Sequence, residues 1–198
     1  MRPHSALLLA AGGSTRLGQP KQLLTVNGVP LVRHTAELLL TTGAERLIVV
    51  TGGAAAEISQ ALVGLDIILA QNNEWETGMA SSLQCGYRAL GTDPGLLLIT
   101  GTDQPRLKCE HLSTLLKLGD NHADVVTAYG EEGRGIPVLL SPITQPRLAD
   151  LRGDTGLRQL WKNGATKPAF LHAPELGFDI DTPEELDAAI RAGWIDPA

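Results

Sequence analysis

The sequence predicts an α/β fold in which helices cover both faces of a mostly parallel sheet, giving three layers. Four apolar runs, at residues 6–11, 46–51, 65–70 and 96–100, have the length and composition of strands. Each run is continuous rather than alternating, which is typical of parallel strands buried on both faces. Segments with helical spacing separate the runs, and this alternation indicates helices on each side of the sheet.

The helices of the first half are predicted from proline and glycine signals and from their position between the apolar runs. A helix is expected at residues 30–40, because Pro30 suits a first helical turn and Gly43 follows as a stop signal. Further helices are expected at residues 54–63 and 80–90, each between two of the apolar runs.

Beyond residue 120 the spacing changes. Residues 123–129 and 136–140 are expected to form two strands around a glycine-rich link, which fits a small antiparallel insertion in the sheet. A last helix is expected to begin at Thr182, where Pro183 and Glu185 complete a capping box. The other elements expected here are short helices at 142–151 and 155–161 and strands at 169–172 and 178–180.

The composition is that of a globular domain with a net negative charge. The 198 residues are 43% hydrophobic and 19% charged, and the formal net charge is −6. A nucleic acid or an anionic membrane would require a basic face, so we expect neither as a partner. No stretch has the composition of a linker, and residues 1–198 are therefore expected to form one domain.

Cysteine usage and the N-terminal stretch predict the compartment. Cys85 and Cys109 are not arranged as C-x-x-C, so free thiols in a reducing compartment are expected. The apolar run near the N-terminus is too short for a signal peptide or a membrane span. We therefore expect a cytoplasmic protein. No apolar heptad favours assembly, which leaves a monomer as the expectation.

The loop after the first apolar run has the features of a phosphate-binding site. Residues 12–21, GGSTRLGQPK, combine glycines with the cations Arg16 and Lys21. Glycine allows the backbone to approach a ligand closely, and successive N–H groups can form an anion-binding concavity. The loop matches neither the Walker pattern nor G-x-G-x-x-G. The alternative is an ordinary turn between a strand and a helix.

Two later loops add candidate ligand groups, because ligands of an open parallel sheet bind at the carboxyl ends of its strands. Residues 72–83 carry Gly78, Ser81 and Ser82, which suit a base or ribose, or only cap the next helix. Asp103 suits Mg²⁺, which prefers one or two carboxylates together with substrate phosphates. The alternative for Asp103 is an Asx-turn.

Asp179 and Asp181 mark a fourth loop near the end of the chain. Alternate residues of a strand share one side, which would place these two carboxylates together. One of them could join Asp103 on a metal while the other caps the following helix, or both could serve only as caps. Asp154 is compatible with a helix cap.

Residues 9–24, LAAGGSTRLGQPKQLL, resemble the signature loop of the nucleotidyltransferases with a Rossmann-like fold. Within that group the chain most resembles the molybdenum cofactor cytidylyltransferases. Five further segments resemble the group's motifs in the same order: ETGMASSL at 76–83, TDQP at 102–105, GIPV at 135–138, GDTG at 153–156 and DIDTP at 179–183. The resemblance covers essentially the whole chain and implies a fold of the nucleotide-diphospho-sugar transferase type.

This resemblance implies a Mg²⁺-dependent nucleotidyltransferase that joins the α-phosphate of an NTP to a phosphorylated acceptor and releases pyrophosphate. Arg16, Lys21 and Asp103 would be catalytic, with the two cations neutralising the charge that develops on the phosphates. Asp103, together with Asp181, would hold Mg²⁺. The residues implied in nucleotide binding are Leu9, Ala10, Ala11, Gly12, Gly13, Arg16, Lys21, Gly78, Ser81 and Ser82.

The resemblance favours CTP as the nucleotide, because Ala11 stands where guanylyl-transferring relatives usually carry glycine. It implies molybdopterin or a similar phosphorylated compound as the acceptor, with a molybdoenzyme or its chaperone as the protein partner. Guanylyl or sugar-phosphate transfer and a non-catalytic cofactor-binding chaperone stay open. So does a glycosyltransferase in which Asp179 and Asp181 form a D-x-D motif. The sequence also leaves open which of these two residues completes the metal site, and the role of Asp154.

Overall fold

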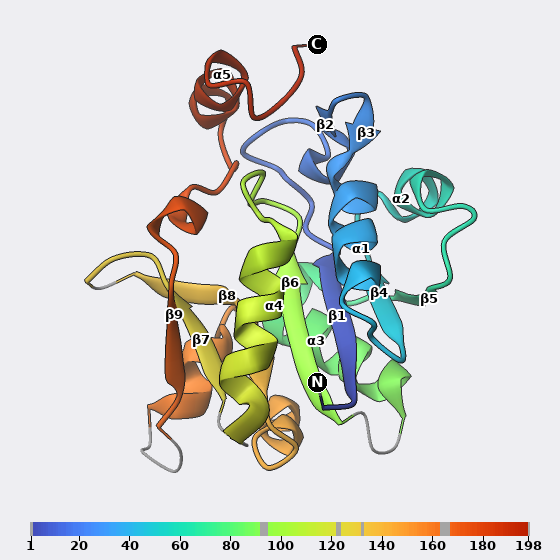
Figure 1. Ribbon diagram of the computed structural model, residues 1–198. Coiled ribbons are helices and arrows are strands. Elements are labelled where there is room, and N and C mark those ends of the chain that lie inside the picture. Colours follow the sequence, from blue (N-terminus) through green and yellow to red (C-terminus); the bar gives the residue numbers. More distant parts are fainter. Residues whose placement is uncertain (1, 92–94, 122–123, 132, 163–166, 198) are drawn as a thin grey trace.

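The computed structural model describes residues 2–91, 95–121, 124–131, 133–162 and 167–197. A seven-stranded sheet in the order β5-β4-β1-β6-β8-β7-β9 forms the middle layer (Figure 1). All neighbouring strands are parallel except the pairs that β8 makes with β6 and β7. The predicted α/β fold is confirmed. The strands are β1 (His4–Ala10), β4 (Leu47–Thr51), β5 (Ile68–Gln71), β6 (Leu96–Gly101), β7 (Val125–Ala128), β8 (Arg134–Leu140) and β9 (Ala169–His172).

Helices cover both faces of the sheet, as the continuous apolar strands require. Helices α1 (Leu31–Thr41), α2 (Ala55–Ala61) and α4 (Cys109–Leu118) pack on one face. Helix α3 (Met79–Leu90) packs on the other and is seen behind the sheet in Figure 1. Strand β1 contributes to both layers of the core, because Leu8 lies in the first core and Leu7 in the second.

Short 3-10 helices fill the connections. They are η1 (Lys21–Leu23), η2 (Trp75–Thr77), η3 (Gly119–Asn121), η4 (Gln145–Asp150), η5 (Leu157–Trp161) and η6 (Pro174–Gly177). Two of them, η4 and η5, stand where short helices were predicted at 142–151 and 155–161. Over the described ranges, no helix combines the length and the apolar character needed to cross a membrane.

The antiparallel insertion is also confirmed. Strand β8 runs between β6 and β7 and pairs antiparallel with both. Strand β7 is shorter than the predicted 123–129, and residue 123 lies outside the described residues. Strand β9 then returns parallel to β7 at the edge of the sheet.

Two sequence predictions need correction. No strand forms at 178–180: this segment has left the sheet, and Ile180 is buried in a separate cluster with Leu17 and Leu31. Helix α4 was not predicted, although its buried Leu112 and Leu115 have helical spacing. The strand prediction at 178–180 failed because its apolar residues serve this local cluster and not the sheet.

The C-terminal segment folds back over the loop that follows β1. Helix α5 (Pro183–Arg191) starts with the predicted capping box, in which Thr182 Oγ1 accepts from the N–H of Glu185. The carboxylate of Asp196 accepts from the N–H groups of Asn27 and Gly28, at 2.9 and 2.8 Å. These two residues form the turn between the short strands β2 (Thr25–Val26) and β3 (Val29–Pro30). Asp181, just before α5, lies beside Arg16 and Lys21 of the loop that follows β1.

Helix α3 approaches the sheet closely at Gly86, where a Cβ atom would clash with Leu7 and Val50. We expect Gly86→Val to lower the free energy of unfolding by about 1–3 kcal/mol, the usual cost of overpacking a core. Ala89→Val places the same side chain on the exposed face of this helix and should cost only about 0.7 kcal/mol or less. Urea denaturation of both variants measures the difference. Equal losses would contradict the packing described here.

Candidate active site

The candidate site lies where the carboxyl ends of β1 and β6 meet. These strands are parallel neighbours, with Leu9 paired with Gly101. The loop after β1 carries Arg16 and Lys21, and the loop after β6 carries Asp103. Strand pairing therefore places the predicted phosphate loop beside the predicted metal ligand.

Gln22 holds the glycine loop from within the protein. The residue is 1% exposed, and its Nε2 donates to the carbonyl oxygens of Ala10 and Gly12, at 3.1 and 2.7 Å. Ser14 has a positive φ of 50°, and its Oγ accepts from the N–H of Lys21 at 3.1 Å. These bonds fix the path of the loop. Sequence analysis missed Gln22, whose only signal is its place next to Lys21.

Trp75 explains why two loops carry glycine. A Cβ atom on Gly13 would lie 2.6 Å from Cζ3 of the Trp75 ring, and one on Gly52 would lie 2.8 Å from its Cγ. Only glycine allows such a close approach of backbone to ring. Gly13 therefore packs against the Trp75 ring, in addition to any contact that it makes with phosphate. Sequence analysis did not identify Trp75.

Three segments meet in a cluster of ion pairs. Lys21 Nζ lies 3.0 Å from Asp103 Oδ2 and 2.7 Å from Asp181 Oδ1. Arg16 Nη2 lies 2.7 Å from Asp181 Oδ2. The predicted residues Arg16, Lys21, Asp103 and Asp181 are thus brought together.

The charges in this cluster shift one another's protonation. Burial by itself lowers the pKa of Lys21, but the charges and hydrogen bonds of Asp103 and Asp181 outweigh it and raise this pKa. Desolvation by itself raises the pKa of Asp181, yet the bonds and charges of Lys21 and Arg16 bring this pKa below its usual range. Lys21 and Asp181 are therefore held in their charged forms near neutral pH.

The carboxylates fit a divalent cation. Asp103 Oδ1 is buried and has no hydrogen-bond partner among the described residues, which is costly unless a ligand satisfies it. The Lys21 ammonium already lies between Asp103 and Asp181, where a cation would be attracted. Across the described residues, no group of three or more His, Cys, Asp or Glu side chains could hold a metal ion by itself. Phosphate oxygens from a substrate would complete such a site.

Gly78 is a close contact between two loops. It has a φ of 112°, and a Cβ atom there would lie 2.5 Å from Asp154 Oδ1. The N–H of Ala80, in the first turn of α3, donates to the carbonyl of Gly153 at 3.1 Å. Asp154 therefore lies over the start of α3 and does not cap η5, whose N-cap residue is Gly156 and which has no side-chain cap.

Asn72 anchors the two predicted serines. Its Nδ2 donates to Ser81 Oγ at 2.8 Å and to Ser82 Oγ at 3.0 Å. Ser81 Oγ in turn donates to the carbonyls of Glu74 and Gly78. The hydroxyl of Ser81 is thus already used within the protein, and Asn72 was missed in the sequence.

A first cavity of about 320 Å³ lies between the glycine loop and α3. Its lining residues are Leu9, Ala11, Gly12, Gly13, Lys21, Gln22, Trp75, Glu76, Gly78, Met79, Ser82, Gly101, Thr102, Asp103, Ile136 and Asp154. Of the predicted nucleotide-binding residues, Ala10, Arg16 and Ser81 do not line it. The carbonyl of Ala10 is bound by Gln22, and Arg16 lies at the rim, paired with Asp181.

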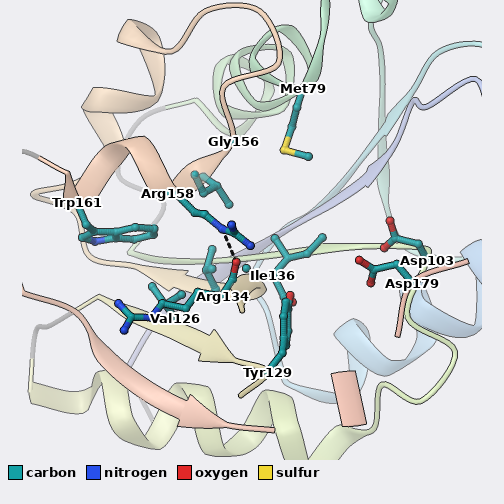
Figure 2. Close-up of a pocket in the computed structure, with 13 residues that line it drawn as sticks. Met79, Asp103, Val126, Tyr129, Arg134, Ile136, Gly156, Arg158, Trp161 and Asp179 are labelled. Carbon is teal, nitrogen blue, oxygen red and sulfur yellow. Dashed lines mark hydrogen bonds between the residues drawn. The ribbon is translucent and has the colours of Figure 1, made fainter. Parts of the chain in front are cut away.

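A second cavity, of about 360 Å³, continues from the first through the shared residues Met79, Asp103 and Ile136. Figure 2 shows Asp103 and Asp179 at one end of it and Trp161 at the other. The complete lining is Met79, Asp103, Val126, Tyr129, Arg134, Gly135, Ile136, Val138, Gly156, Leu157, Arg158, Trp161 and Asp179. Sequence analysis named only Asp103 and Asp179 as site candidates among these.

The walls of the second cavity are fixed by hydrogen bonds. Trp161 Nε1 donates to Oδ2 of the buried Asp124 at 2.8 Å. Arg158 Nε donates to the carbonyl of Arg134 at 2.6 Å, the dashed line of Figure 2. Gln104 Nε2 donates to the hydroxyl of Tyr129 at 3.1 Å. The cavity therefore presents aromatic surfaces and two guanidinium groups to a ligand.

Comparison with known proteins identifies relatives over most of the chain. The family model for the MobA-like NTP transferase domain matches residues 6–169. The purine catabolism protein PucB of Bacillus subtilis (strain 168) is 30% identical over 203 residues, which cover 94% of this chain and 95% of PucB. The bifunctional protein GlmU of Exiguobacterium sibiricum is 31% identical over 159 residues, 74% of this chain but only 35% of GlmU.

Solved structures share the fold. Rv0371c of Mycobacterium tuberculosis H37Rv, crystallised in complex with manganese, superposes with a TM-score of 0.77 at 25% sequence identity. The match covers 96% of this chain and 99% of that protein.

Asp179 generates a pH prediction. Burial and the nearby charge of Asp103 raise the pKa of Asp179 from 3.8 to about 7. The folded protein then keeps a proton that the unfolded chain releases, so this carboxyl lowers the free energy of unfolding as the pH rises between those two values. Asp179→Asn removes this contribution to the pH dependence of the free energy of unfolding. The variant should gain stability over the wild type at about pH 8 relative to about pH 5.

The measurement is urea denaturation of both proteins at the two pH values, with EDTA present to exclude metal. Asp179 lines the second cavity, where neighbouring atoms desolvate its carboxyl, but the residue as a whole keeps contact with solvent, so screening keeps the gain small. A stability difference between variant and wild type that does not change with pH would contradict the raised pKa.

Proposed function

This chain belongs to the MobA-like NTP transferase family and is a nucleotidyltransferase, and we propose that it transfers CMP from CTP to a phosphorylated acceptor, molybdopterin, with release of pyrophosphate. The observation that carries this proposal is the position of Asp103. It lies beside Lys21 and lines both cavities, so a nucleotide in one and an acceptor in the other would meet there. Residues 1–198 would act as one domain.

On the nucleotide side, the first cavity supports binding of a triphosphate by the loop after β1. The backbone of Ala11, Gly12 and Gly13 lines the cavity, and Lys21 lies at its floor beside Asp103. Lys21 and Arg16 would neutralise charge on the α-phosphate and on the leaving pyrophosphate. Phosphoryl chemistry of this kind depends mainly on positioning and on charge stabilisation.

At the junction of the cavities, Asp103 would hold Mg²⁺ together with Asp181 or Asp179. The manganese complex of Rv0371c is consistent with a divalent metal in this fold. A bound Mg²⁺ would act as a Lewis acid on the phosphoryl oxygens. The contribution of this chain is to place the two carboxylates and to exclude competing hydrogen bonds from Asp103 Oδ1.

On the acceptor side, the second cavity supports a ligand with a flat ring system and an anionic group. Tyr129 and Trp161 offer aromatic surfaces, and Arg134 and Arg158 offer positive charge. Molybdopterin combines a planar pterin with a phosphate, which matches this lining. A molybdoenzyme or its chaperone would then receive the product.

The choice of nucleotide is tested by pyrophosphate release with Mg²⁺, molybdopterin and each NTP in turn. Release with CTP alone is the expected result, because Ala11 stands where guanylyl-transferring relatives usually carry glycine. Release with GTP alone would move the chain to guanylyl transfer. Tight molybdopterin binding without turnover on any NTP would indicate a carrier protein and contradict the proposal.

The assigned roles predict that Lys21→Ala and Asp103→Ala each lower kcat by about 100-fold or more, the usual effect of removing one charge-stabilising group. Lys117→Ala, an exposed lysine on α4, is the matched control and should keep the wild-type rate. Circular dichroism verifies that each variant folds. A near-normal rate in either site variant would remove that residue from the mechanism.

A further inference from the structure

We propose that this protein binds the nucleotide's phosphates and the divalent metal as a coupled pair, because the cations assigned to the phosphates are paired in this structure with the carboxylates assigned to the metal. Lys21 and Arg16 have their charges directed at Asp103 and Asp181. The inference rests on the proposed function and adds to it how the two ligands affect each other's binding.

Most carboxylate oxygens of Asp103 and Asp181 already accept a hydrogen bond from Lys21 or Arg16. Lys21 Nζ contacts Asp103 Oδ2 and Asp181 Oδ1, and Arg16 Nη2 contacts Asp181 Oδ2. Of the four oxygens of these two aspartates, only Asp103 Oδ1 has no partner among the described residues. A metal that binds both carboxylates therefore competes with an ammonium or a guanidinium group for the oxygens of Asp181.

The charges of the cluster determine whether phosphate binding strengthens or weakens metal binding. Asp103, Asp179 and Asp181 carry up to three negative charges, and Lys21 and Arg16 carry two positive ones. With both cations in place the cluster has little net charge to attract Mg²⁺. When Lys21 and Arg16 bind phosphate instead, the negative charge of the carboxylates is no longer neutralised and their oxygens are free to bind the metal. Phosphate binding therefore raises metal affinity, and by linkage the metal raises phosphate affinity by the same factor.

The two cations differ in how readily they leave. The Arg16 side chain is 70% exposed, so it can swing from Asp181 to a phosphate without a change of backbone. The Lys21 side chain is only 13% exposed and lies next to the first cavity, so it needs a short movement to reach a phosphate there. Arg16 would release first, and Lys21 would contribute the larger part of the coupling.

The coupling is tested by Mn²⁺ binding, followed by electron paramagnetic resonance of free Mn²⁺, to the whole protein without nucleotide. Exposed ion pairs are weak, so Arg16→Gln should tighten Mn²⁺ binding by about two- to fivefold. Lys21→Met, which removes a less exposed cation with two partners, should tighten it by about tenfold. Both substitutions lower activity, yet both are expected to improve metal binding.

Arg134→Gln is the matched control, because it removes the same charge from the lining of the second cavity. Among the described residues, Arg134 stacks on Phe170, 4.6 Å from the ring centroid, and makes no ion pair with a carboxylate. We expect its Mn²⁺ affinity to stay within about 1.5-fold of the wild type. An equal gain in all three variants would show a general charge effect and overturn the proposal.

The reciprocal arm measures CTP binding by calorimetry in EDTA. Asp181→Asn frees Arg16 and weakens the hold on Lys21, so it should tighten metal-free CTP binding by about threefold or more. Unchanged Mn²⁺ and CTP affinities in the variants, with the Mn²⁺–CTP complex still bound, would overturn the coupling alone. No binding of Mn²⁺ or CTP to the wild type under any condition would overturn the proposed function as well.

Discussion

The bridge that Lys21 makes between Asp103 and Asp181 joins segments 82 and 160 residues apart in the chain. The loop after β1, the loop after β6 and the segment before α5 meet there. The pairing of β1 with β6 brings the first two together, and the apolar cluster that Ile180 shares with Leu17 brings the third. The positive charge of the Lys21 ammonium offsets the electrostatic repulsion among the carboxylates of Asp103, Asp179 and Asp181. The cluster of ion pairs thus also helps to hold these three segments together.

Most of the sheet was predictable because buried parallel strands are continuous apolar runs, and the ends of β1, β4 and β6 lie within two residues of the ends of their runs. Helix α4 was missed because the sequence around Cys109 has no cap signal, although its buried leucines have helical spacing. The strand expected around Phe178 does not form. That aromatic residue packs edge-on against Trp194 at 5.1 Å, a local contact that no strand pattern indicates.

The candidate site was predictable where chemistry and spacing coincide. Arg16, Lys21 and Asp103 are charged residues in glycine- or proline-containing loops, and such residues stand out. The supporting residues could not be found in this way, since Gln22, Trp75 and Asn72 act through tertiary contacts. Gln22 bonds two carbonyls, Trp75 requires glycine at its contacts, and Asn72 holds two hydroxyls. Which glycines serve a ligand and which serve packing depends on neighbours distant in sequence.

The central claim is that Asp103 is where metal, nucleotide and acceptor meet. A crystal structure with Mn²⁺ and a CTP analogue carrying an α,β-methylene bridge, recorded with anomalous scattering, tests it most directly. The account predicts a manganese peak coordinated by Asp103 and one of Asp179 and Asp181, with Lys21 Nζ moved from the carboxylates to a phosphate. A nucleotide bound elsewhere, or a metal away from Asp103 with Lys21 still bridging both carboxylates, would contradict it.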